Sequence, residues 1–141
     1  MRAGGVEGGW PEPRAFACHT PADATRIWAA LTDAELTKNY LYGLAAHSTW
    51  VPDAPIDVRY GDRPQLTGRV LCARPNERLS YVLHSGPADP PVYLTWLIRP
   101  CGGGCIIRLQ IDEIDADDSA DDVEDTWLPV LAALQQFLAS D

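Results

Sequence analysis

The chain has 141 residues, a length typical of one domain with a single hydrophobic core. Hydrophobic residues make up 46% and charged residues 22%, which excludes a disordered or fibrous chain. The formal charge is −9, but nine of the 20 acidic side chains fall within residues 112–125, and the other 11 are balanced by 11 Lys and Arg. Because the acidity belongs to one segment and no basic patch accompanies it, nucleic acid and anionic membranes are not expected partners.

The first thirteen residues are rich in Gly and Pro. They are predicted to form a flexible tail, so we expect one domain over residues 14–141. The start of the chain carries no apolar secretory segment, which predicts a cytoplasmic protein. Its four cysteines are therefore expected to be thiols.

The first elements are a predicted strand at residues 14–20 and two helices. Each helix start, "TPAD" and "TDAE", has a Thr that can cap the helix and an acidic residue three positions later. These patterns predict a helix at 21–31 capped by Thr20. They also predict a shorter helix that is capped by Thr32 and ends near Tyr42.

Six further strands are predicted, because runs of alternating hydrophobic residues are separated by turn sequences. They cover residues 46–52, 56–60, 66–74, 77–84, 92–100 and 104–112. Short turns make neighbouring strands antiparallel. One face of the sheet is predicted to be hydrophobic, with rows formed by Gly68, Val70 and Cys72, by Leu79, Tyr81 and Leu83, by Leu94, Trp96 and Ile98, and by Ile107, Leu109 and Ile111. The opposite face is predicted to meet water, with Thr67, Arg69, Ser80, His84, Arg99, Arg108 and Gln110.

The last predicted element is a helix in "DTWLPVLAALQQFLASD", which carries no charge from Thr126 to Ser140. Its hydrophobic stripe consists of Trp127, Val130, Leu131, Leu134 and Leu138. The helix is too short to span a bilayer, which needs about 20 apolar residues. We therefore expect it to cover the hydrophobic face of the sheet. Pro129 is tolerable if the helix begins near Thr126 and bends it if the helix begins near Asp121.

Several motifs together resemble one known family. They are "TPADATRIWAALTDAELTKNYLYG", "STWVPDAPIDVRY", "LTGRVLCARPNERLSYVL", "YLTWLIRPCGGGCIIRLQI" and "DTWLPVLAALQQFL". In this order they resemble the family named after the activator of the ninety-kilodalton heat-shock chaperone's ATPase (AHSA-type), within the START-like, or SRPBCC, superfamily. Two departures are Cys105, where the family usually has Thr, and a terminal helix without the customary basic residues.

The resemblance implies an α+β helix-grip fold, in which a curved antiparallel sheet wraps around the terminal helix, often with a cavity between them. Members bind lipids, sterols, polyketides or other apolar molecules; some are cyclases, and the namesake docks on a chaperone. If such a cavity exists, we expect the following residues to surround it: Tyr40, Tyr42, Trp50, Val70, Tyr81, Leu83, Leu94, Trp96, Ile107, Leu109, Trp127, Leu131 and Leu134. Apolar walls with a few hydroxyl groups suit a hydrophobic ligand; the alternative is that these side chains simply fill the core.

The predicted hydrophobic face contains no acid, base or histidine, so the sequence assigns no catalytic residue and no cofactor or metal. The alternatives to small-molecule binding are a protein-interaction module, as a co-chaperone or a partner of a transcriptional repressor, and a polyketide cyclase.

Two other motifs are candidate sites. Cys101 and Cys105 flank "GGG" and are predicted to be plain thiols, with a redox pair and a metal site as the alternatives. The acidic segment lacks the Gly and the final Glu of a calcium-binding EF-hand loop. It reads as a solvated loop or as a docking site for a basic partner.

Overall fold

The computed structural model describes residues 14–84, 91–113 and 120–139. Within them lie one seven-stranded antiparallel sheet and three helices. The predicted tail at 1–13 and residues 114–119 of the acidic segment fall outside the described residues. The side chains of residues 120–125, which belong to the same segment, are outside them as well.

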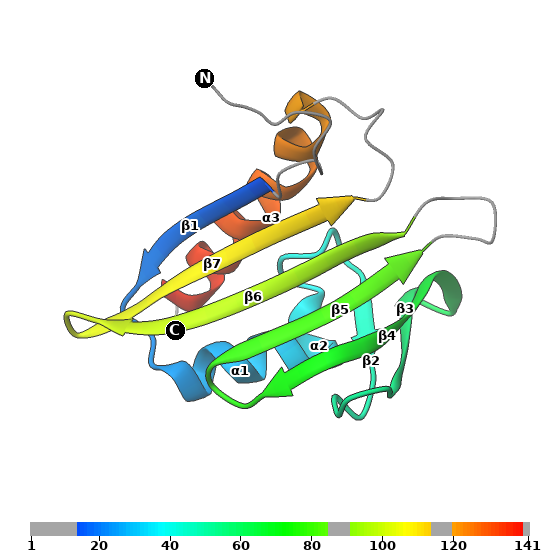
Figure 1. Ribbon diagram of the computed structural model, residues 1–141, viewed down its shortest axis with the longest axis horizontal. Helices are drawn as coiled ribbons and strands as arrows, with labels where there is room; N and C mark the ends of the chain where they lie inside the picture. The colour runs from blue at the N-terminus through cyan, green and yellow to red at the C-terminus, as the bar shows by residue number, and fades with distance from the viewer. Residues whose placement is uncertain (1–13, 85–90, 114–119, 140–141) are drawn as a thin grey trace, which may run out of the picture.

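Strands that follow one another in the sequence are neighbours in the sheet, except for the first strand (Figure 1). The strands are β1 (Arg14–Thr20), β2 (Ala45–His47), β3 (Pro55–Tyr60), β4 (Arg63–Arg74), β5 (Arg78–His84), β6 (Val92–Cys101) and β7 (Gly104–Glu113). Their order is β1-β7-β6-β5-β4-β3-β2, because β1 pairs with the last strand in the chain. Strands β2 and β1 are therefore the two edges.

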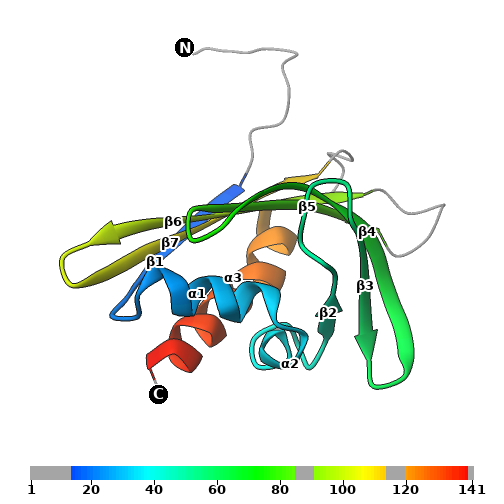
Figure 2. The same ribbon diagram turned by 90° about the horizontal axis from the view of Figure 1, so that it is seen from below.

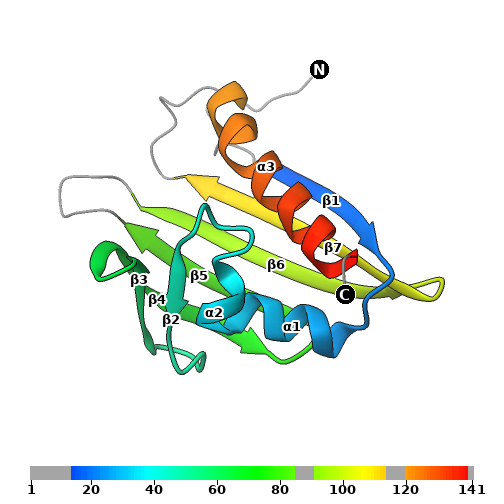
Figure 3. The same ribbon diagram turned by 180° about the vertical axis from the view of Figure 1, so that it is seen from behind.

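The three helices lie on the same face of the sheet (Figures 2 and 3). They are α1 (Ala24–Thr32), α2 (Ala34–Thr37) and α3 (Ala120–Ala139). Helix α3 runs along β1 and beside α1, while the sheet curls at β3 and β4 toward the helical side (Figure 2). None of the helices in the described part of the chain is long and apolar enough to cross a membrane. A curved sheet around a C-terminal helix confirms the predicted helix-grip architecture.

The core lies between the helical layer and the sheet face that the sequence predicted to be hydrophobic. The predicted rows on β5, β6 and β7 are all buried, with exposed fractions between 0% and 8%. From α3, the buried side chains are Val130, Leu131, Leu134 and Leu138. Each set repeats with the period of its element, two for strands and about 3.6 for the helix.

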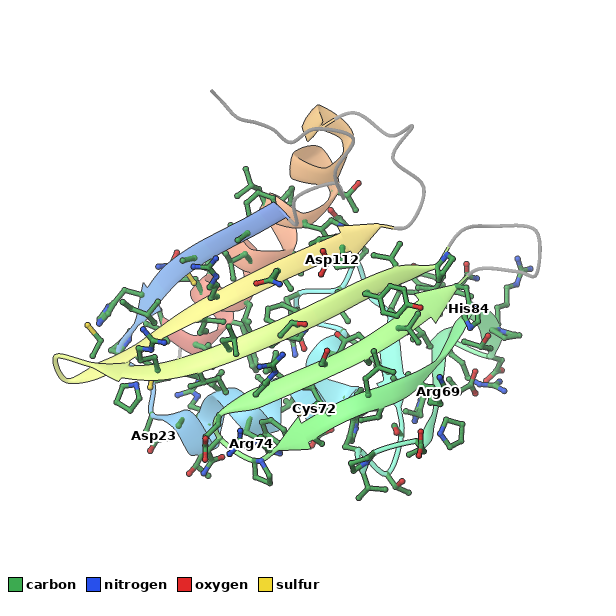
Figure 4. The ribbon with its side chains drawn as sticks, viewed as in Figure 1. Asp23, Arg69, Cys72, Arg74, His84 and Asp112 are labelled. Atoms are coloured by element: carbon green, nitrogen blue, oxygen red, sulfur yellow. The ribbon has the colours of Figure 1, made fainter. Side chains whose placement is uncertain are left out.

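Strand β4 departs from the predicted alternation. The pairing of β4 with β5 shifts between Val70 and Cys72, so Cys72 stands opposite Ser80 rather than on the buried row. A β-bulge inserts one residue and reverses the faces of every later position. The prediction that Cys72 faces the core is therefore wrong: it lies on the outer face (Figure 4), and Ala73 packs against the core instead.

Both predicted helix caps were one to three positions early. Helix α1 is capped by Asp23, whose carboxylate accepts from the backbone of Arg26, and helix α2 by Asp33, which accepts from Glu35. Thr20 accepts from Ala22 in the turn that precedes α1 instead. Asp accepts from free helical N–H groups at least as well as Thr does, so the aspartate that directly precedes each helix caps it.

Two predicted elements are shorter than expected. Helix α2 stops at Thr37 rather than near Tyr42, and the strand expected at 46–52 is the three-residue β2, which ends at His47. Beyond that strand, Trp50 and Asp53 have positive φ values of 55° and 72°, which no strand can contain. These irregular segments form part of the site described next.

Candidate functional site

A cavity of about 180 Å³ lies on the helical side of the sheet, beside the curled strands β3 and β4. Strands β2 to β5, the segment that precedes β2 and the middle of α3 enclose it. Its lining residues are Leu41, Tyr42, Leu44, Ala46, Trp50, Ile56, Val58, Leu66, Tyr81, Leu83, Thr126, Trp127 and Val130. None of these described residues carries a formal charge at neutral pH, so the cavity is a hydrophobic chamber with aromatic walls.

Five of the thirteen predicted lining residues meet at this cavity: Tyr42, Trp50, Tyr81, Leu83 and Trp127. The other eight, Tyr40, Val70, Leu94, Trp96, Ile107, Leu109, Leu131 and Leu134, are buried in the adjoining core, with exposed fractions of 5% or less. They belong to the hydrophobic core that also contains residues of α1 and of the later turns of α3. Whether any of the thirteen contacts a ligand remains a prediction.

The sequence reading missed eight lining residues: Leu41, Leu44, Ala46, Ile56, Val58, Leu66, Thr126 and Val130. A signal existed for four of them. Ile56 and Val58 alternate on β3, and Leu66 shares the parity of Gly68 and Val70 on β4. Val130 belongs to the hydrophobic stripe predicted for the terminal helix. Leu41 and Leu44 lie in turns, where no periodicity indicates which side is buried.

The left-handed backbone of two aromatic residues shapes the cavity wall. Tyr42 and Trp50 have φ values of 56° and 55°, which are uncommon for bulky side chains and are found at functional sites. Gly43 follows with a φ of 82°, and a β-carbon added there would lie 3.0 Å from the ring of Tyr60. The tight turn at 42–43 therefore needs glycine at its second position.

Tyr42 ties this turn to the terminal helix. Its hydroxyl group donates a 2.6 Å hydrogen bond to the backbone carbonyl of Thr126 in α3. Tyr42 is 59% exposed and also lines the cavity, so its ring lies at the boundary between the cavity and solvent. The contact joins two segments that are 84 positions apart, across the edge of the cavity.

A network of aromatic side chains connects the cavity wall to the adjoining core. The Trp96 indole N–H donates to the Tyr81 hydroxyl at 2.9 Å, and Tyr40 donates to the carbonyl of Ala30 at 2.8 Å. Trp50 packs edge-to-face on Tyr81 with ring centroids 5.8 Å apart. Trp50 differs from the others, because its Nε1 atom is buried and has no hydrogen-bond partner among the described residues.

Burial keeps the titratable groups of this region neutral. It raises the pKa of Tyr81 to about 12, although the hydrogen bond from Trp96 opposes the shift, and it raises the pKa of Tyr40 well above its usual value of 10.0. On β1, away from the cavity, burial also raises the pKa of Cys18 from 9.0 to about 11. These groups are consequently hydrogen-bond donors at neutral pH rather than anions or nucleophiles.

The remaining candidate groups lie away from the cavity. His19, His47 and His84 are exposed, and so are Arg69 and Arg108, the outer-face arginines on β4 and β7 (Figure 4 labels Arg69 and His84). All four cysteines are free thiols: Cys101 is exposed at the β6–β7 turn and Cys105 is buried. Within residues 14–84, 91–113 and 120–139, no group of three or more His, Cys, Asp or Glu side chains could hold a metal ion.

The fold is shared with solved proteins. A protein of Chromobacterium violaceum superposes with a TM-score of 0.75 at 16% identity, over 93% of this chain and 99% of its own. An Hsp90 activator of Plasmodium falciparum gives 0.72 at 9% identity, over 91% and 96%. DynU16, a protein of the dynemicin biosynthetic locus, gives 0.74 at 16% identity, over 91% of this chain but only 47% of its own.

The sequence comparison identifies the family more directly than these distant structures can. No curated protein sequence matches the chain. Residues 21–139 match the family model described as activator of Hsp90 ATPase homolog 1-like protein. This match begins three residues before α1 and runs through the sheet to the end of α3, so it includes every element that encloses the cavity. The chain therefore belongs to the activator of Hsp90 ATPase homolog 1-like family.

Proposed function

We propose that the protein binds a hydrophobic small molecule in the cavity between β2–β5 and α3, without catalysing a reaction. The observation that carries this proposal is the cavity of about 180 Å³ with uncharged, largely aromatic walls. Small-molecule sites are typically apolar pockets with a few polar groups. A cavity of roughly 150 Å³ lined by Leu, Ile and Phe is known to take benzene, so this one has room for a small aromatic molecule or for the ring of a larger one.

The described lining residues include no acid, base or histidine, which supports binding rather than catalysis. A cyclase would need a buried acid or base next to its substrate. Arg69, Arg108 and His84, the nearest candidates in the sequence, are exposed on the outer face of the sheet. The free thiols favour a reducing compartment, which is why we also propose a cytoplasmic location.

The test fills the cavity without removing any contact. Ala46 is buried on β2 and lines the cavity, so Ala46→Leu should place a larger side chain in the empty space. We expect the wild-type protein to bind the bicyclic probes indane or 1-indanone saturably in isothermal titration calorimetry, and the variant to bind at least tenfold more weakly, because each probe loses its space.

The matched control is Ala132→Leu, the same substitution at an exposed position of α3. It should bind like the wild type. If neither probe binds the wild-type protein, or if Ala46→Leu binds both as well as Ala132→Leu does, the cavity is not a binding site.

A second candidate is a role as a co-chaperone. It is favoured by the family and by the similarity to the Hsp90 activator of Plasmodium falciparum. Stimulation of an Hsp90 ATPase should then be unaffected by Ala46→Leu but lost when the acidic residues within 112–125 are replaced by amides, if that segment is the docking site. A stimulation that needs an empty cavity would instead connect the two functions.

A further inference from the structure

The outer face of the sheet carries a second candidate site, on the opposite side from the cavity. We propose that four arginines at one end of this face bind an acidic peptide segment of a partner protein. They are Arg74, Arg78, Arg99 and Arg108, which we call the arginine cluster. Figure 4 looks onto this face and labels Arg74 at the end of β4. The inference does not depend on the proposed function, because the cavity lies on the helical side of the sheet.

The register of the strands brings the cluster together from separate parts of the sequence. Leu97 on β6 stands opposite both Arg108 on β7 and Arg78 on β5. Arg78 stands opposite Arg74 on β4, and Arg99 follows on the same face of β6. Neighbouring strands are about 4.8 Å apart, so the row from β7 to β4 is roughly 14 Å long. The sequence contains no run of basic residues here, so the patch becomes visible only in the folded sheet.

The four guanidinium groups of the cluster are exposed, and within the described part of the chain they form no ion pair or side-chain hydrogen bond. Elsewhere on the sheet, Arg59 is paired with Asp57 and Arg69 with Asp53. Glu77 lies in the β4–β5 turn beside the cluster, but it forms no ion pair with a described residue. Like charges directly opposite on neighbouring strands repel, so a bound anion would relieve a repulsion that this face leaves uncompensated.

The composition of the patch favours a peptide over a phosphate surface. Guanidinium groups bind carboxylates and phosphates with paired hydrogen bonds, so either anion could satisfy them. However, Leu97 and Ile106 stand beside the arginines on the same face, and Ile106 is 36% exposed. A peptide can place apolar side chains on these two residues and acidic side chains on the cluster, whereas a phosphate backbone offers only its charge.

The net charge of the protein favours a short ligand over a large polyanion. The chain carries a charge of −9, and nine of its acidic residues fall within 112–125, at and after the end of β7. Charges more than about 8 Å away are largely screened at physiological salt, so a short segment experiences mainly the cluster. A nucleic acid duplex or a vesicle would extend over the rest of a negatively charged protein. An extended segment of about four residues is long enough to cross the row of arginines.

The probe is a fluorescein-labelled hexaglutamate peptide, titrated with the protein and followed by fluorescence anisotropy. We expect saturable binding that weakens as salt is added, and no binding of a hexaglutamine peptide, which has no charge. Replacing two arginines together, with Arg78→Gln and Arg108→Gln, should weaken the binding of hexaglutamate at least about tenfold, because their charge-assisted hydrogen bonds are lost. Both side chains are exposed, so the fold should not be affected.

The matched control combines Arg63→Gln with Arg69→Gln, which changes the net charge equally at exposed positions of β4 outside the cluster. Its affinity for hexaglutamate should stay within about twofold of the wild-type value, because charges at that distance are screened. The conservative pair Arg78→Lys and Arg108→Lys should bind with intermediate affinity, because an ammonium group keeps the charge but not the paired hydrogen bonds.

Four results would overturn the inference. The first is that the wild-type protein does not bind hexaglutamate, and the second is that the cluster variant and the control variant bind it equally well. The third is tighter binding of a short DNA duplex or of phosphatidylserine vesicles, which would make the cluster a site for phosphate surfaces. The fourth is a dimer in sedimentation velocity that only the cluster variant abolishes, which would make a second copy of this chain the occupant.

Discussion

Tyr81 links the stability of the core to the chemistry of the cavity. It accepts the indole proton of Trp96, a side chain with no solvent exposure, and it also lines the cavity. A buried donor that loses its acceptor costs more than the hydrogen bond itself contributes, because water cannot replace the partner. A single residue therefore takes part both in the packing of β5 on β6 and in the wall of the cavity.

Tyr81→Phe should lower the free energy of unfolding by about 1–3 kcal/mol, because it leaves the Trp96 N–H unpaired while keeping the ring. Urea unfolding followed by tryptophan fluorescence measures the change. Tyr93→Phe removes a hydroxyl on the outer face of β6, and it should change the stability by less than about 0.5 kcal/mol. Equal effects of the two variants would show that the Tyr81–Trp96 bond contributes nothing specific.

At the scale of residues, the sequence predicted which side chains face the core, but it did not predict where the cavity lies. Leu131 and Leu134 share a stripe of α3 with Trp127, yet they pack directly on the core while Trp127 lines the cavity. Periodicity tells which side of an element is buried. It does not tell where along the element two layers separate, because that depends on how the sheet curls.

At the scale of the elements, the most unusual feature is Pro129, a proline inside helix α3. The helix spans Ala120–Ala139, so the proline lies in its interior, as it would in a helix that begins near Asp121. Proline lacks an N–H group, so the carbonyl four residues earlier loses its helical donor. Two of the nearby residues, Thr126 and Trp127, take part in the cavity wall.

Pro129→Ala should therefore stabilise the protein by about 1–3 kcal/mol, because it restores a helical hydrogen bond at an exposed position. Thermal unfolding by circular dichroism measures the change. Ala132→Gly in the same helix should lower the stability by about 1 kcal/mol and shows that the assay reports on α3. A loss of stability in Pro129→Ala would mean that the fold requires the proline at this point of the helix.

The elements themselves were largely predictable, and the exceptions have local causes. Seven strands and the terminal helix follow from alternation and turn residues, but the shift between Val70 and Cys72 is invisible in "GRVLCAR", where hydrophobic residues occupy both faces. The sequence likewise does not reveal the left-handed backbone of Trp50, which lies within the strand predicted at 46–52. Bulges and turns of this kind are set by the twist of the whole sheet rather than by their own sequence.

At the scale of the whole molecule, the raised pKa values of Tyr81 and Cys18 allow us to predict how the free energy of unfolding depends on pH. Tyr81 has a folded pKa of about 12 against 10.0 unfolded, and Cys18 about 11 against 9.0. The folded state then holds protons that the unfolded state releases, so their contribution is complete below pH 9 and is lost as the pH rises through these folded values. Each pKa unit corresponds to about 1.4 kcal/mol, with less for the half-buried Cys18.

Urea unfolding at pH 8, 10 and 11 should show a falling free energy of unfolding. In Tyr81→Phe the fall between pH 10 and pH 11 should be smaller, because that variant has no hydroxyl to titrate at this position. A stability that stays constant up to pH 11 would contradict the burial of these groups.

The central claim concerns the space between the curled end of the sheet and α3. A crystal structure of the protein with 1-indanone at saturating concentration tests it most directly. We predict density for one probe molecule enclosed by Trp50, Tyr81 and Trp127. A chamber filled by its own side chains, or a probe bound only elsewhere on the surface, would contradict the account.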